Sequence, residues 1–496
     1  MQSESNSRQA MWVAIGQFFA YAIGIISPMI LSRYFDKSDY GTYKQVMYVY
    51  NTLLSVFTLG LPRAYSYFIP RVSLGESKDV VRKISRLFLL LGFLFSALLF
   101  LGSPLIADLL KNPNLELALK WFSPTPLLLL PVMGMDGILA SYKKAGYIAI
   151  YTVLSRTFML LCIVMPVLCF NGTYVHAIIG FDIASLLTFL LSLYLRELPT
   201  KNIDWEKTQV TYRQIFAFSL PLLTASLWIM VFHSVNQFFI SRYYGTEVFA
   251  EFSNGFMDFP INQMILGAVA TVLMPLFSGM AVRNKEEIGE VWNGALNKTI
   301  KLIYPMTVYC IMFAPLVMTC FYGRQYESSG IYFAIKSVEA FFTVIPFYPI
   351  VLALGKSKEY SNVHMVIAIV IVPLEYIIVF LGGTAYMIGI AYVACAIAKV
   401  VLQFKVVNKS LDLSFKELIP LGSMLKITGV SILAAMPAFI LLSVSSEINE
   451  WIMLLVTLAA YVVVYYVLCW ITRVSYKDIV ISSLGQRLRP LVKYIP

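Results

Sequence analysis

Runs of about twenty apolar residues recur from Trp12 almost to the end of this chain. A helix needs roughly 20 apolar residues to cross the ~30 Å hydrocarbon core of a bilayer, so each run is long enough to span a membrane. Only 13% of the 496 residues are charged, against roughly 25% in a soluble domain. These features leave no room for a large soluble domain and predict an all-α integral membrane protein.

Fourteen segments qualify as candidate spans. They begin near Met11, Val46, Leu87, Trp121, Tyr147, Tyr174, Ile215, Phe252, Leu302, Ile331, Asn362, Ala385, Ile427 and Trp451. Lys and Arg test this count, because they concentrate in the cytoplasmic loops of membrane proteins. Of the 38 basic residues, 27 fall in alternate segments starting with the N-terminus, seven fall in the segments between, and four fall inside spans. The alternation predicts an even number of spans, with both termini in the cytoplasm.

Charge and cysteine placement exclude several classes of partner. The net charge of +11 is spread over short inter-helix segments and not over one compact face, which excludes a nucleic-acid partner. The six cysteines lie in apolar runs without CxxC spacing, so they predict buried apolar residues and no metal site. Gly355-Lys356-Ser357 is similar to the end of a phosphate-binding loop, but Ile350 stands where that loop needs glycine. We expect no cofactor.

Two short echoes link the halves of the chain. Leu31–Phe35 (LSRYF) returns 209 residues later as Ile240–Tyr244 (ISRYY), and the set Ala140, Lys143, Tyr147 returns 213 residues later as Ala353, Lys356, Tyr360. Both echoes join spans that are six apart, and an even separation makes the repeats parallel, related by a pseudo-two-fold axis along the membrane normal. We expect a six-helix lobe over residues 1–200, a cytoplasmic linker over 201–214, a second six-helix lobe over 215–410, and two extra helices with a basic cytoplasmic tail over 411–496.

Three stretches carry a resemblance to a known family. Leu31–Tyr43 (LSRYFDKSDYGTY), followed by Phe57–Leu61 (FTLGL) and Ala64, resembles the N-terminal signature of polysaccharide-export flippases of the O-antigen and capsule type. Phe321–Tyr326 (FYGRQY) looks like the aromatic-glycine turn of that family between spans nine and ten. The family belongs to the MOP superfamily, which also holds the MATE drug exporters and the lipid II flippases.

The resemblance implies a V-shaped bundle of two lobes that rocks around a central cationic cavity. Its implied cargo is an undecaprenyl-pyrophosphate-linked oligosaccharide, moved from the cytoplasmic to the outer face of the cell inner membrane. Membrane lipid, and the polysaccharide polymerase and glycosyltransferases of the same pathway, are the implied partners. Span one, Trp12 to Leu31, lacks the arginine pattern of the lipid II flippases, which weighs against lipid II as the cargo.

Ionisable residues inside spans are the candidates for chemistry, since each costs roughly 2.5 to 3.5 kcal/mol on insertion scales. Arg156 in span five and Asp182 in span six both lie near mid-membrane. One interpretation is a cation for pyrophosphate with an acidic neighbour that tunes it; the other is a structural ion pair. Arg63 and Lys399 lie about a turn from the expected cytoplasmic ends of spans two and twelve, where they would contact an entering pyrophosphate or extend to the interface.

Four further residues fall in the second expected lobe, over 215–410. Lys336 and Glu339 share a helix face, so mutual neutralisation is expected, although either could line the cavity. Glu375 has no basic residue in its span, which makes it our candidate for proton or sodium coupling, with a packed carboxyl that is protonated or hydrogen-bonded as the alternative. His233 belongs to a polar stripe suited to inter-helix hydrogen bonds or to sugar hydroxyls.

Two other functions compete with a flippase. A MATE-like exporter of cationic drugs predicts twelve helices and a chiefly acidic site, whereas this chain has extra helices and basic groups within spans. A membrane enzyme would need catalytic residues in a sizeable outer loop, and the expected outer loops are short. We therefore predict a transport protein and not an enzyme.

Overall fold

The computed structural model describes residues 6–283, 287–345, 347–411, 418–444 and 448–479, and all secondary structure in these ranges is helical. By its internal contacts the chain divides into two compact units, Met1–Ala250 (unit 1) and Glu251–Pro496 (unit 2). The expected all-α class is confirmed. Each unit is described by itself.

Unit 1 contains the first ten α-helices and three short 3-10 turns. They are α1 (Asn6–Tyr34), α2 (Lys37–Phe57), α3 (Pro62–Phe68), η1 (Ile69–Arg71), α4 (Leu74–Leu109), α5 (Asn114–Phe122), α6 (Pro124–Leu129), η2 (Leu130–Val132), α7 (Met135–Ser141), α8 (Ala145–Phe170), α9 (Tyr174–Glu197), η3 (Leu198–Thr200) and α10 (Tyr212–Gly255), whose last residues enter unit 2. Side-chain caps fix the starts of two long helices, α2 and α4. Ser73 and Glu76 form a reciprocal capping box at α4, and Asp36 accepts the backbone N–H of Asp39 at α2.

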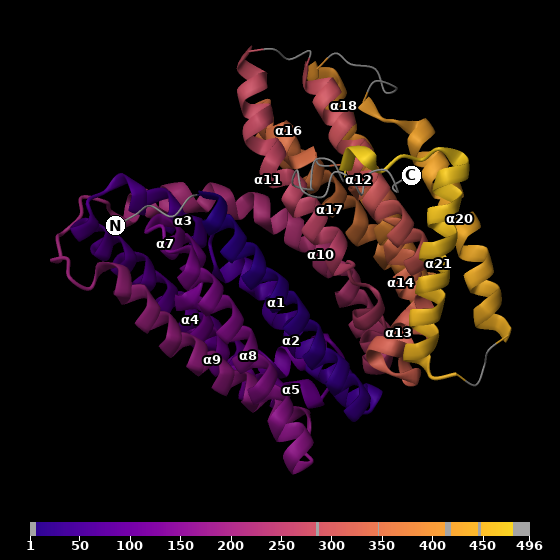
Figure 1. Ribbon diagram of the computed structural model, residues 1–496. Helices are drawn as coiled ribbons and strands as arrows, with labels where there is room; N and C mark the ends of the chain where they lie inside the picture. The colour runs from indigo at the N-terminus through magenta and orange to yellow at the C-terminus, as the bar shows by residue number, and fades with distance from the viewer. Residues whose placement is uncertain (1–5, 284–286, 346, 412–417, 445–447, 480–496) are drawn as a thin grey trace. The chain divides into compact units, whose positions relative to one another are not determined.

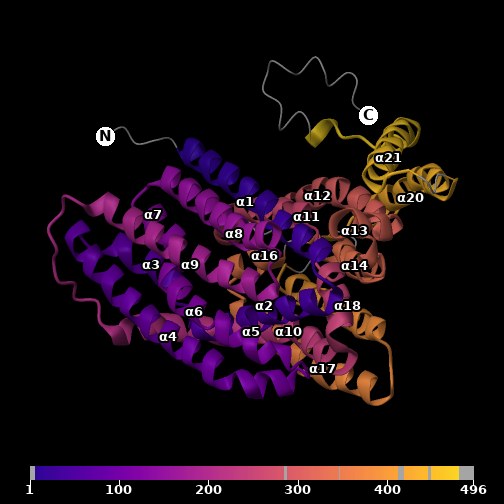
Figure 2. The same ribbon diagram turned by 90° about the horizontal axis from the view of Figure 1, so that it is seen from below.

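Long helices pack side by side in unit 1. α8 lies between α1 and α9 and packs against both, while α4 packs against α5 and α6 (Figures 1 and 2). An aromatic stack joins α2, α4 and α5. The Phe95 ring lies parallel to Tyr50 and to Phe57 at centroid distances of 5.8 and 4.5 Å, and Phe122 meets Tyr50 edge-on at 5.2 Å. These rings connect three helices whose contact stabilises the unit.

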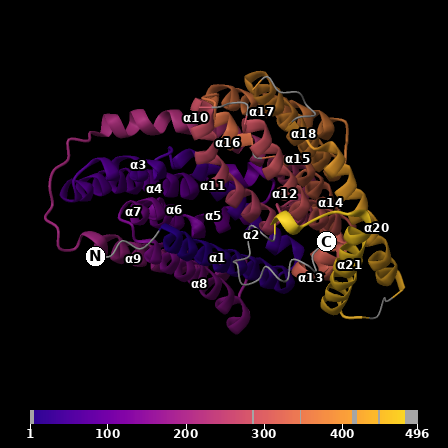
Figure 3. The same ribbon diagram turned by 45° about the horizontal axis from the view of Figure 1, so that its top comes forward.

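Unit 2 contains the remaining helices. They are α11 (Pro260–Arg283), α12 (Glu287–Met312), α13 (Ala314–Tyr322), η4 (Arg324–Tyr326), α14 (Ser329–Val338), α15 (Ala340–Thr343), α16 (Phe347–Ala353), α17 (Ser357–Phe380), α18 (Ala385–Leu411), α20 (Leu421–Val444) and α21 (Glu450–Thr472). α20 and α21 lie side by side near the end of the chain, and α20 also packs on α12 (Figure 3). The indole N–H of the buried Trp292 donates to the Leu418 carbonyl at 2.9 Å, which ties α12 to the segment before α20.

Proline and glycine break several expected spans. The fourth begins at Asn114, earlier than expected, and is divided into α5, α6, η2 and α7 around three prolines and Gly134, whose φ is +86°. α12 and α13 bend by 81° at their junction, just before Pro315. Proline lacks the N–H that continues the helix ladder, which explains these breaks. Irregular backbone at membrane depth is tolerated where protein buries it or where it lines a cavity.

The sequence echoes fall at helix junctions. Leu31–Phe35 ends at the α1–α2 turn, and its partner Ile240–Tyr244 precedes Gly245, where α10 kinks with a φ of +86°. The second echo falls at the α7–α8 and α16–α17 turns. The echoes therefore mark corresponding turns, which supports a repeat, while the lobe boundaries at 200, 215 and 410 stay predictions.

Among the described residues, ten helices are long and apolar enough to cross a membrane, or twelve if each of two bent pairs is one span. α1 and α2, with 29 and 21 residues, are not among those twelve. A multi-pass helical membrane protein is therefore confirmed. The count of fourteen stays a prediction.

Candidate functional site

Arg156 lies near the middle of α8 and lines a cavity of about 280 Å³ inside unit 1. Asp136 at the start of α7 and Tyr151 one turn earlier on α8 line the same cavity, together with Gln17 of α1 and Ser155. The arrangement brings a guanidinium, a carboxylate and hydroxyl groups to one space between apolar helices. Such a space suits a polar, anionic group, because a guanidinium fork matches phosphate oxygens.

Asp182 occupies a different environment from Arg156. Its carboxylate accepts a hydrogen bond from the Thr125 hydroxyl of α6 at 2.5 Å. No ion pair joins Asp182 to Arg156 in the described part of the chain, and the acidic residue that shares the Arg156 cavity is Asp136. The suggestion that Arg156 and Asp182 face each other therefore gives way to an Arg156–Asp136 neighbourhood.

A buried charge cluster lies at the break between α14 and α15. Lys336 Nζ is 2.5 Å from a Glu339 oxygen and 3.1 Å from an Asp258 oxygen, and both Lys336 and Glu339 are buried. The Lys336 ammonium also lies over the rings of Phe256 and Tyr392, at 5.5 and 4.8 Å from their centroids. The expected mutual neutralisation of Lys336 and Glu339 is confirmed. The cluster lines a small polar cavity at the interrupted helix.

Lys399 lies half-buried in α18 and lines a cavity of about 220 Å³ with His364 and Tyr360 of α17 and with Gln403. α18 continues to Leu411, so Lys399 is roughly three turns from the helix end and not one. Its cavity and that of Lys336 are distinct in their lining residues apart from Leu266 and Thr343. Unit 2 thus holds two spaces lined by a lysine, and in the Lys336 space two carboxylates accompany the cation.

Glu375 is fully buried in α17, and neither of its carboxyl oxygens has a hydrogen-bond partner in the described residues. Its expected isolation from other polar groups is confirmed, and the alternative that remains beside ion coupling is a packed, protonated carboxyl. An ionised carboxylate without a partner is strongly disfavoured in such a place, so the group needs a proton or a cation.

Arg63 and His233 line none of these three cavities. Arg63 is exposed on α3, a separate short helix, because α2 ends at Phe57 and the backbone at Leu59 and Gly60 turns through positive φ values of 47° and 69°. His233 is exposed on α10, with its ring edge-on to Phe232 at 5.2 Å. The structure does not bring either residue to Arg156 within unit 1.

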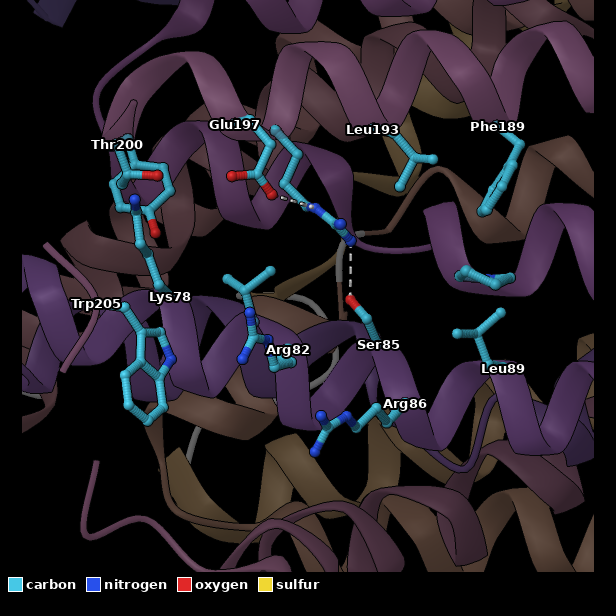
Figure 4. A pocket seen from close by; sticks show the side chains of 14 residues that line it. Lys78, Arg82, Ser85, Arg86, Leu89, Phe189, Leu193, Glu197, Thr200 and Trp205 are labelled. Atoms are coloured by element: carbon cyan, nitrogen blue, oxygen red, sulfur yellow. Dashed lines mark hydrogen bonds and ion pairs between the residues drawn. The ribbon is translucent and has the colours of Figure 1, made fainter. Parts of the chain in front are cut away.

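The sequence reasoning missed a basic cavity of about 370 Å³ between α4 and α9 (Figure 4). Lys78, Arg82 and Arg86 of α4 and Arg196 of α9 line it. Burial raises the pKa of the Tyr142 phenol in its wall, so this group is even less ionised at pH 7 than an ordinary tyrosine. A signal was present in the sequence, because residues 78, 82 and 86 recur every four positions and must share a helix face. Counted only as loop charges, they indicated topology and not a site.

Comparison with known proteins connects this geometry to a family. A family model described as "polysaccharide biosynthesis protein" matches residues 7–281. No curated protein shows significant similarity to the chain.

Solved structures share the fold at low sequence identity. A lipid II flippase, MurJ, in an inward closed conformation is 16% identical, with a TM-score of 0.70 over 95% of this chain and 100% of that one. An inward-facing multidrug resistance MATE transporter of the MOP superfamily is 13% identical, with a TM-score of 0.66 over 79% and 94% of the two chains. A MOP superfamily transporter from Pyrococcus furiosus, whose binding pocket is described as having reverse polarity, is 14% identical with a TM-score of 0.59 over 82% and 95%.

Proposed function

Because this chain belongs to the polysaccharide biosynthesis protein family, we propose that it is a flippase for a lipid-linked oligosaccharide. The cargo in this proposal is an undecaprenyl-pyrophosphate-linked repeat unit of an O-antigen or capsule. It crosses from the cytoplasmic to the outer face of the inner membrane by alternating access, and both termini lie in the cytoplasm. The pathway's polymerase and glycosyltransferases would act beside it.

The observation that carries the proposal is the cation within the α8 cavity. A guanidinium in the middle of a membrane-spanning helix is costly, so its presence beside a space for a ligand supports an anionic cargo. Hydroxyl and amide groups of Tyr151, Ser155 and Gln17 in the same lining offer hydrogen bonds to sugar or phosphate oxygens. Lys399 supplies a further cation beside a cavity in unit 2.

The first test of the proposal follows the lipid-linked intermediate in cells that lack this gene. We expect the intermediate to accumulate on the cytoplasmic face, where a membrane-impermeant glycosidase added to intact cells cannot reach it, and we expect the wild-type gene to restore its exposure. Normal surface polysaccharide in the deleted strain would contradict the proposal and would favour a drug exporter, which an efflux assay would then examine.

Arg156 provides the second test. Arg156→Ala should lower transport by about ten- to a hundredfold, because a hydrogen bond to a charged group contributes roughly 1.5 to 3 kcal/mol. Arg156→Lys should keep part of the rate, since it keeps the charge but not the fork. Arg213→Ala removes an exposed arginine outside the cavities and serves as the matched control. Full transport by a well-folded Arg156→Ala protein would assign Arg156 to structure alone.

A further inference from the structure

The basic cavity of unit 1 has a composition unlike its surroundings. Four cationic side chains line it, against a single carboxylate, Glu197, among the lining residues. Figure 4 shows Lys78, Arg82 and Arg86 on one helix, with Glu197 across the cavity from them. Like charges four residues apart on a helix destabilise it by roughly 0.2 to 0.5 kcal/mol per pair. A bound anion would remove this repulsion.

Some of the cations are already held in place without an anion. Lys78 Nζ donates to the Ile203 carbonyl at 2.7 Å, and the Arg82 guanidinium lies 5.8 Å from the Trp205 ring centroid. Arg196 donates from one terminal nitrogen to the Ser85 hydroxyl at 3.1 Å. These contacts fix the positions of the charges before any ligand arrives, which lowers the cost of binding.

Arg196 also carries an unfilled donor. Its Nε is buried and makes no hydrogen bond in the described part of the chain, and the nearest carboxylate oxygen, on Glu197, is 3.7 Å away. A buried donor left unsatisfied costs about 1 to 3 kcal/mol. The ion pair with Glu197 offsets part of that cost and holds the guanidinium at the cavity wall.

The other end of the cavity is apolar. Leu89 of α4 and Phe189 and Leu193 of α9 form this wall. The next turns away from the charges expose large apolar side chains on both helices, as expected for a face that contacts lipid tails. They are Leu90, Phe93 and Leu94 on α4 and Leu186 and Leu190 on α9. On both α4 and α9, the charged side chains at one end of the cavity are therefore followed by exposed apolar side chains further along the helix.

We propose that this cavity binds the phosphate head group of an anionic glycerophospholipid from the cytoplasmic leaflet, with the acyl chains along the exposed faces of α4 and α9. Basic residues of this part of the chain lie on the cytoplasmic side by the positive-inside rule, and basic pockets between membrane helices on that side suit anionic head groups. Trp205, half-exposed beside Arg82, is a side chain that favours the interface. The apolar wall favours a lipid over free phosphate.

Native mass spectrometry of the full-length protein in detergent tests the site with two lipids, phosphatidylglycerol and phosphatidylcholine. Wild type should retain phosphatidylglycerol in preference, and Arg82→Gln with Arg86→Gln should weaken that retention about tenfold or more, because two charge-assisted contacts are lost. Lys358→Gln with Lys405→Gln removes the same charge outside the cavity and should leave retention unchanged. Equal retention by the cavity variant and the control would overturn the proposal.

Competition identifies the source of the phosphate. Inorganic phosphate at millimolar concentration should fail to displace phosphatidylglycerol; displacement would show a site for soluble anions and overturn the lipid assignment. Undecaprenyl pyrophosphate should compete no better than phosphatidylglycerol itself. A strong preference for undecaprenyl pyrophosphate would overturn the proposal and assign the cavity to binding of the transported lipid. If the double Gln variant does not fold, Arg82→Lys with Arg86→Lys keeps the charges and should still discriminate phosphatidylglycerol from phosphatidylcholine. Loss of discrimination by that folded variant would contradict head-group binding by charge.

Discussion

At the scale of one residue, the burial of Glu375 determines which protonation state its carboxyl can adopt. The carboxyl is fully buried in α17 and lacks hydrogen-bond partners in the described residues. Burying an unpaired ionised carboxylate costs several kcal/mol, so the uncharged acid is the form that suits this static arrangement. Gain and loss of a proton would then require the surroundings of Glu375 to change.

Glu375→Gln tests this residue directly. Glutamine keeps the shape of the neutral acid, so we expect a folded protein with a melting temperature close to wild type, but transport that no longer responds to an imposed proton or sodium gradient. The measurement compares flipping in vesicles with and without each gradient, using wild type as the reference. A gradient response as large as that of wild type would remove Glu375 from ion coupling.

Single side chains join α2 to α10 at the scale of elements. Gln45 of α2 donates to the Ser241 hydroxyl at 2.7 Å with both residues buried, and the Tyr48 hydroxyl donates to the Ser234 carbonyl at 3.2 Å. Gly41, near the start of α2, lies directly against the backbone oxygen of Thr246. Small residues permit such close approach between helices within a membrane.

Gly41→Ala should weaken the packing of α2 against α10. The added Cβ would overlap the Thr246 backbone, and overpacking of this kind costs about 1 to 3 kcal/mol. We expect a lower melting temperature in detergent for Gly41→Ala. The matched control is Gly146→Ala at the start of α8, where nothing lies within 4 Å of the added methyl group and stability should be unchanged. Equal melting temperatures for the two variants would show that α2 and α10 can move apart to accommodate the added methyl group without loss of stability.

Topology is the prediction that belongs to the whole molecule. An even number of spans with a cytoplasmic N-terminus predicts that green fluorescent protein fused to the C-terminus is fluorescent and that alkaline phosphatase fused there is inactive. Fusions made after Asn171, in the turn between α8 and α9, should give the opposite result, because that turn is expected outside. The same behaviour at both fusion points would show that a span has been missed or invented.

Class and order of the elements followed from the sequence alone. Apolar runs predict spanning helices because the bilayer offers no other partner for the backbone, and a helix is found at each of the fourteen expected segments. Helix ends were less predictable. The break that places Arg63 on α3, and the division of the fourth span into α5, α6, η2 and α7, depend on how each proline or glycine is accommodated by its neighbours.

The sequence by itself determined that this protein is a helical membrane protein and that the expected span of Glu375, which begins near Asn362, holds no lysine or arginine. Only the tertiary structure decided which charged groups share a space: Arg156 and Asp136 line one cavity, Lys336 pairs with Asp258 as well as Glu339, and Arg196 lines a cavity with the basic face of α4. The physical reason is that the sequence does not specify how a membrane helix is rotated about its own axis. A helix such as α8 is apolar on nearly every side, so its sequence specifies that it crosses the membrane, while packing against α1 and α9 sets the direction in which Arg156 points.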